Sequence, residues 1–155
     1  MPKEVMRRTA ADNPYLHKDF HGALSTGIEY LHEHFGADAV RDYLRQFASA
    51  YYAPLTAAMR ERGLTAMKEY LEHMYAAEGG DISLVGFDDE LMLEVAACPA
   101  VTHMREHGYR VARLWSETTR TVYEAICEGT PFAVEMAEYD DATGRARVRF
   151  YRRRQ

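Results

Sequence analysis

At 155 residues, with no long apolar run, the chain fits one domain, 1–155, that can bury its own hydrophobic core without disulfides or a structural metal. Two cysteines and the lack of an apolar signal segment at the start predict a reduced, cytoplasmic setting, and charged residues break every apolar run, which excludes a membrane-spanning helix. Before position 145 there are 13 basic and 24 acidic residues, and such an acidic body disfavours nucleic acid as a partner.

The first half has the apolar periodicity of helices. Asn13-Pro14 is a helix start signal, and apolar residues then recur every three or four positions from Leu16 to Gly36. A second helix follows, and Pro54 should kink or stop it. A third runs to the Gly79-Gly80 break, with Met and Tyr side chains that we interpret as packing. The sequence predicts three N-terminal helices.

After Gly80 the apolar period changes to two, which is typical of strands. Pro99 to His107 reads as a short helix, and Ser116 can cap another. Four strands are expected near 82–87, 91–97, 132–139 and 145–151. The prediction is an α+β fold in which the three N-terminal helices pack on one face of a four-stranded antiparallel sheet made of two hairpins, with helices between them.

The last strand is rich in arginine. Residues 145–155 hold six arginines and no acid, and Arg145, Arg147 and Arg149 alternate with apolar residues. This alternation favours a half-buried strand with a charged outer face over an anion-binding tail. Glu135 on the preceding strand is expected to face the arginines.

Cys98 is the first candidate catalytic residue. It ends a strand and precedes Pro99, so its sulfur should lie at the positive end of a helix, where a thiol pKa is lowered. Cys127 lies in the last turn of its helix, where the dipole disfavours a thiolate. The alternative for Cys98 is a small buried hydrophobic residue at the strand end.

His17 and His21 are the other candidate catalytic residues. They lie four apart near the start of the first helix, so they share one face, and Gly22 and Ala23 leave room beside His21. Such a pair can relay a proton or bind a metal. Without a third ligand, two histidines are a weak signal for a metal site. No phosphate loop, serine nucleophile elbow or zinc-finger cysteine pair occurs, and we expect no cofactor.

The order of motifs in the second half is that of a known family. A hairpin, Cys98-Pro99 opening a short helix, a segment with Trp115, a further helix, Gly129 and a closing hairpin resemble the L-2-amino-thiazoline-4-carboxylic acid hydrolases. The arrangement is more distantly similar to the vinyl-reductase-like small-ligand domain. Residues 15–24, which open the first long helix, also look like the hydrolase family.

The resemblance implies an enzyme that hydrolyses a cyclic carbon–nitrogen bond in a small sulfur- or nitrogen-containing heterocycle. Members of that family often carry a cysteine in the final hairpin, where this chain has Arg145 to Phe150. If the chemistry depends on that cysteine, this protein is a relative that has lost or changed the activity, and only the position of Cys98 carries over.

Two hypotheses from different classes follow. In the enzyme, Cys98 attacks or polarises the ring carbon while His21, with His17, moves the proton to the leaving atom. In a sensor-like binding module, the same cleft holds a small planar ligand against aromatic and Met side chains. The expected partner is a small-molecule ligand or substrate, and neither nucleic acid nor a membrane is expected. The sequence leaves open whether the protein forms a homo-oligomer.

Overall fold

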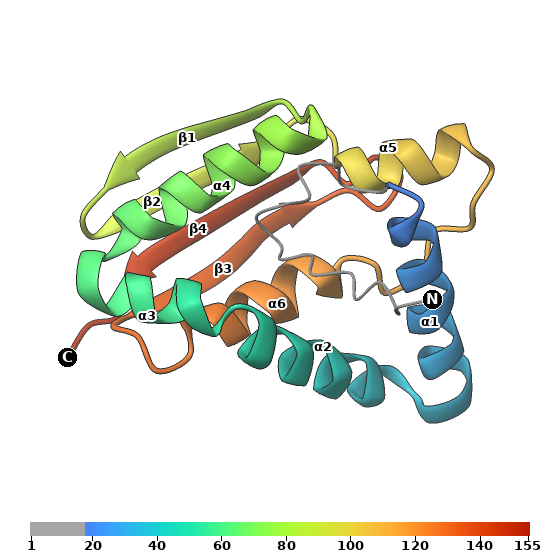
Figure 1. Cartoon of the computed structure of the whole chain (residues 1–155), viewed down its shortest axis with the longest axis horizontal. Helices are drawn as coiled ribbons and strands as arrows, with labels where there is room; N and C mark the ends of the chain where they lie inside the picture. The colour runs from blue at the N-terminus through green and yellow to red at the C-terminus, as the bar shows by residue number, and fades with distance from the viewer. Residues whose placement is uncertain (1–17) are drawn as a thin grey trace, which may run out of the picture.

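The structure, a computed structural model that describes residues 18–155, has an α+β fold (Figure 1). In this part of the chain, six helices accompany a four-stranded antiparallel sheet. In chain order the elements are α1 (Phe20–Phe35), α2 (Ala37–Tyr51), α3 (Ala53–Arg62), α4 (Leu64–Glu78), β1 (Ile82–Phe87), β2 (Glu90–Val95), α5 (Pro99–Glu106), α6 (Glu117–Cys127), β3 (Phe132–Tyr139) and β4 (Ala146–Arg152). None of the described helices is long and apolar enough to cross a membrane.

Four described helices precede the sheet, where three were expected. Pro54 marks a break between two helices and not a kink within one helix: α2 ends at Tyr51, and α3 begins at Ala53 with Pro54 in its first turn. The reason is that proline lacks the amide hydrogen needed inside a helix but not at its start. The predicted start signal at Asn13-Pro14 lies outside the described residues.

The sheet has the strand order β1-β2-β4-β3 (Figure 1). β1 pairs with β2 and β3 with β4, while β2 and β4 pair at the centre, all antiparallel. The edge strand β3 has a register shift between Met136 and Glu138. The strands therefore lie within one or two residues of the ranges that alternation predicted.

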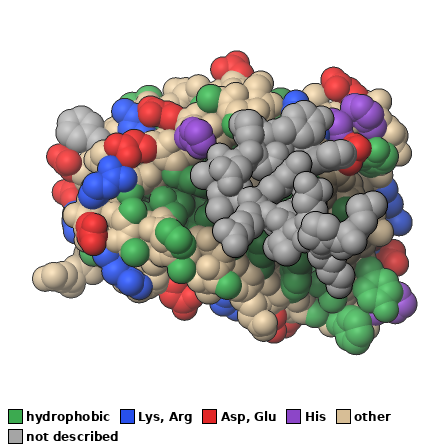
Figure 2. Space-filling view, in the orientation of Figure 1, with side chains coloured by type: hydrophobic (Ala, Val, Ile, Leu, Met, Phe, Trp, Pro, Cys, Tyr) green, Lys and Arg blue, Asp and Glu red, His purple; other side chains and the backbone are tan. Residues whose placement is uncertain are grey.

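The two faces of the sheet differ in polarity. Leu93 and Val148 are opposite each other in the register and fully buried. On the other face, Arg147 contacts Glu94 at 2.9 Å and Glu138 at 3.7 Å. Arg149 likewise bridges the strands on either side of β4, and Figure 2 shows basic and acidic side chains next to one another around the rim of the molecule. The interpretation of β4 as a half-buried strand with a charged outer face is confirmed.

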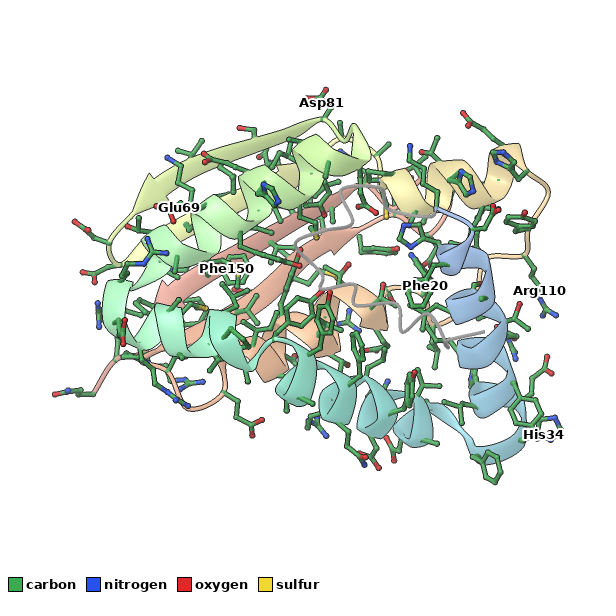
Figure 3. All side chains as sticks on the ribbon, viewed as in Figure 1. Phe20, His34, Glu69, Asp81, Arg110 and Phe150 are labelled. Atoms are coloured by element: carbon green, nitrogen blue, oxygen red, sulfur yellow. The ribbon has the colours of Figure 1, made fainter. Side chains whose placement is uncertain are left out.

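Helices cover the apolar face. The Tyr123 ring on α6 lies 5.3 Å from the Phe150 ring on β4, and α4 contacts β1 and β2. The helices α2 and α3 pack outside α6 and α4, and α1 contacts both α2 and α5. Figure 3 shows Phe150 in the interior, while His34 and Arg110 point outward at the edge of the molecule.

The inner face of α1 is hydrogen-bonded to residues 110–113, which lie between α5 and α6. Ser25 Oγ donates to the Arg110 carbonyl at 2.7 Å and accepts from the Ala112 amide at 2.8 Å. One turn later, Glu29 accepts hydrogen bonds from the backbone and the guanidinium of Arg113. Burial works to raise the pKa of Glu29, but these bonds and the charges of Arg113 and Arg110 outweigh it, so the pKa is lowered. These contacts anchor the residues just before Trp115.

The burial of one face of the sheet predicts which substitutions lower the free energy of unfolding. Phe150 is fully buried, so Phe150→Ala should cost about 3–5 kcal/mol of unfolding free energy through lost burial and a cavity. Val85, an aliphatic residue that is 66% exposed on β1, is the control, and Val85→Ala should change stability by less than about 0.5 kcal/mol. Urea denaturation followed by circular dichroism measures both, and equal losses would contradict this assignment of the faces.

Candidate functional site

Cys98 lies where the chain passes from β2 into α5. It is the N-cap residue of α5, its amide donates to the Thr143 carbonyl at 3.0 Å, and its carbonyl accepts from the Thr102 amide at 3.0 Å. Gly144, in the turn between β3 and β4, has a φ of +70° and lies directly against Cys98, with no room for a Cβ atom. The Cys98 backbone is therefore held by both its own helix and the final hairpin.

The expected lowering of the Cys98 pKa is wrong in its net direction. Burial raises the pKa of the thiol, hydrogen bonds from the backbone amides of Val101 and Ala100 lower it, and the nearby Glu78 carboxylate raises it. The indole of Trp115 also lies beside the thiol and lowers its pKa. The helix start thus acts as expected, but desolvation is the larger effect and the pKa is raised.

His21 faces the interior from the first turns of α1. Its Nε2 lies 2.8 Å from Glu78 Oε1, and the two side chains are only 16% and 11% exposed. Because an ionised carboxylate only accepts hydrogen bonds, Nε2 carries the proton and Nδ1 is left as the second reactive atom. The His21 ring also meets the Trp115 ring edge-on, with 6.3 Å between centroids. Trp115 therefore lies next to both His21 and Cys98.

His17 lies outside the described residues, so its relation to His21 stays a prediction. Among residues 18–155, no group of three His, Cys, Asp or Glu side chains could hold a metal ion. The described partner of His21 is a carboxylate, an arrangement that orients an imidazole for proton transfer.

Gly80 brings the end of α4 to the start of α5. A Cβ atom at this position would lie 2.7 Å from Tyr75 Cδ1 and 2.8 Å from Pro99 Cγ, so a larger residue would push the two helices apart. Glu78 is the last residue of α4, and Cys98 precedes the first residue of α5. The carboxylate thus lies at the negative end of one helix and the thiol at the positive end of another.

Tyrosines surround this junction. Burial raises the pKa of Tyr75, and the Cys98 thiol adds to the effect, while a hydrogen bond with Tyr123 lowers it. Tyr70 Oη donates to Tyr52 Oη at 3.1 Å. Burial also raises the pKa of Tyr52, Tyr70, Tyr123 and Tyr139. The phenols are therefore neutral hydroxyls at physiological pH and can serve as hydrogen-bond donors.

A groove of about 240 Å³ lies at the end of the sheet where β1 and β4 begin. It is lined by Asp81, Ile82, Ser83, Glu94, Val95, Ala96, Glu138, Arg145, Ala146 and Arg147. None of these is Cys98, His21 or Glu78. Arg147 already pairs with two carboxylates there, so the candidate site is the buried cluster around Cys98 and not the groove.

The structure brings Cys98 and His21 to one cluster and adds two partners that the sequence did not point to. Glu78 is 57 positions from His21 in the chain, and Trp115 was marked only by the family resemblance. The sequence analysis did not single out Glu78; the signal that could have done so is an acidic residue at the end of a helix, which is electrostatically unfavourable there.

A scan of protein-family models and a search of curated proteins found no match for this chain. The candidate site is therefore defined by the contacts of Trp115 with Cys98 and His21 and by the contact of His21 with Glu78.

The two thiols should differ in reactivity. Cys127 is 1% exposed, and burial raises the pKa of its thiol to about 12, whereas Cys98 is half-buried and has hydrogen-bond donors beside it. Iodoacetamide should modify Cys98 faster than Cys127, and both more slowly than a cysteine in an unfolded peptide. Peptide mapping by mass spectrometry measures the rates, with Cys127→Ser as the control that leaves the faster phase. Equal or reversed rates would remove Cys98 as the nucleophile.

Proposed function

We propose that this protein is a hydrolase that opens a carbon–nitrogen bond in a small heterocycle, with Cys98 as nucleophile and His21 as proton carrier. The observation that carries the proposal is the 2.8 Å contact of His21 with Glu78, in a cluster whose tryptophan also adjoins Cys98. A nucleophile, an imidazole and a carboxylate that orients it are the groups that thiol hydrolases need.

In the proposed reaction, the Cys98 thiol passes its proton to His21 and its sulfur bonds to the C=N or C=O carbon of the ring. The ring carbon–nitrogen bond breaks, and the nitrogen leaves with the proton from His21. A water molecule then attacks the carbon and its proton returns through His21 to the sulfur as the carbon–sulfur bond breaks. One water is consumed, and the free thiol is restored.

The raised pKa of Cys98 is consistent with a need for a base. A thiol that is mostly protonated at neutral pH requires proton removal during attack, and His21 is the imidazole in the same cluster. Glu78 would hold the imidazole through Nε2 and stabilise the imidazolium once it forms. His17 would assist His21 only if it lies on the same side of α1.

The family resemblance supports the same reaction. The order of a hairpin, the Cys98-Pro99 helix start, Trp115, a helix and a closing hairpin resembles that of the L-2-amino-thiazoline-4-carboxylic acid hydrolases. The final hairpin has no cysteine in this chain, so Cys98 is the thiol to which the chemistry is assigned.

The second candidate is a sensor-like module that binds a small planar ligand without turnover. Its supporting observation is again the raised pKa of Cys98, because a buried neutral thiol beside Trp115 and several tyrosines is also a good wall for an aromatic ligand. The two candidates share the site and differ in whether the ligand is consumed.

The test is ring opening of 2-amino-2-thiazoline and its 4-carboxylate, followed by proton NMR. Cys98→Ser should abolish turnover, and His21→Ala should lower kcat by about 10²–10⁴ because the proton carrier is lost. The Cys127→Ser variant is the matched control and should keep full activity. His21→Ala also removes the described hydrogen-bond partner of the Glu78 carboxylate, so it should lower the free energy of unfolding by about 1–3 kcal/mol.

Binding of either ring compound without any turnover would contradict the proposed hydrolase and support the sensor-like binding module. Turnover that survives in Cys98→Ser would contradict the role of the thiol.

A further inference from the structure

We infer that the ligand of this site carries a planar, delocalised cation of the amidinium type and no carboxylate. The inference rests on the proposed function only for the location of the site, since it concerns the charge that the site selects. It follows from the Glu78 oxygen that no side chain or amide of residues 18–155 occupies, from the helix end that carries this residue and from the neutral aromatic side chains around it.

Only one carboxylate oxygen of Glu78 is paired within residues 18–155. Its Oε1 receives His21, while Oε2 has no hydrogen-bond partner among residues 18–155. In this part of the chain, no Lys or Arg forms an ion pair with Glu78. A carboxylate that is 11% exposed and half satisfied is a good acceptor for an N–H donor from a ligand, and a charged donor gives the stronger bond.

The end of α4 adds negative potential at the same place. Gly79 closes the helix in the left-handed conformation, and the last turn contains no basic residue to offset the carbonyl dipoles. An anionic ligand group beside Glu78 would therefore face both a like charge and the negative end of a helix. A cationic group would be favoured by both.

The tyrosines near the site are uncharged. Burial raises the pKa of Tyr52, Tyr75 and Tyr123, so these phenols stay neutral and present ring faces and hydroxyls. A planar cation gains cation–π stabilisation against tryptophan and tyrosine rings. Trp115 lies beside the thiol and the imidazole, where it can take that role.

A cation would also activate the thiol. Burial and Glu78 both raise the pKa of Cys98, and a cationic ligand that pairs with Glu78 would offset the second effect as it binds. The carbon of an amidinium group is itself electrophilic, so its N–H groups can bond Glu78 while its carbon faces the sulfur at the start of α5. The thiol would then be reactive mainly when the correct ligand is present.

Three alkylating reagents of similar size and different charge test the inference: 2-chloroacetamidine, 2-chloroacetamide and chloroacetate. Rates at Cys98 are measured by intact-mass spectrometry and divided by the rate of each reagent with glutathione, which removes intrinsic reactivity. The cationic reagent should exceed the neutral one by about tenfold or more, and the anionic reagent should be slowest.

Glu78→Gln should abolish most of the preference, because it keeps the shape and the acceptor for His21 but removes the charge. Glu72→Gln, on an exposed residue of the same helix, is the matched control and should keep the preference. The charge series on the wild-type protein stands by itself if Glu78→Gln does not fold.

Equal normalised rates for the three reagents, or a preference for chloroacetate, would overturn the inference. A cation preference that Glu78→Gln leaves unchanged would also overturn it. Ring opening that depends on Cys98 without any cation preference would contradict this inference but support the proposed hydrolase. A cation preference without turnover would support this inference but contradict the hydrolase.

Discussion

The close approach of α4 and α5 at Gly80 is the constraint on which the site depends. Because only a hydrogen atom fits between Tyr75 and Pro99, the C-terminal part of α4 lies against the start of α5. Glu78 at the end of α4 is then near enough to raise the pKa of Cys98, and the two residues lie at helix ends of opposite polarity. The sheet beneath them fixes both helices, since α4 packs on β1 and β2 and the hairpin of β3 and β4 touches Cys98 through Gly144.

Two opposing effects decide the state of the thiol. Backbone amides and the Trp115 indole favour a thiolate, while burial and the Glu78 carboxylate favour the protonated form, and the second pair prevails. The result is a protonated thiol near an imidazole that is paired with a carboxylate. Such a site suits chemistry in which the ligand or His21 releases the thiolate at the moment of reaction.

Much of the fold could be predicted from local patterns. Alternation of Val148 with Arg147 and Arg149 is enough to predict β4 and its two faces, because the period of a strand is fixed. The helix count was wrong at Pro54, where the sequence allows both a kink and a break. The dipeptide Cys98-Pro99 correctly placed a thiol at a helix start, since proline favours the first helical turn.

The site itself was less predictable because its energetics come from distant parts of the chain. The pKa of Cys98 depends on how deeply the thiol is buried and on Glu78, and neither appears in the local sequence. His21 was singled out by its spacing from His17, yet its described partner, Glu78, lies 57 positions away. Contacts of this kind follow from the packing of α1 against the other elements and not from any motif.

The proposed coupling of Cys98 and His21 is tested most directly by the pH profile of Cys98 alkylation. The rates of reaction with iodoacetamide would be compared between the wild-type protein and His21→Gln from pH 5 to 10. A raised thiol pKa means that the free thiolate accounts for alkylation mainly above the ordinary value of 9.0, so reaction below that range depends on a neighbouring proton acceptor. His21→Gln should slow alkylation below that range and leave the alkaline rate unchanged, whereas superimposable profiles would contradict the coupling.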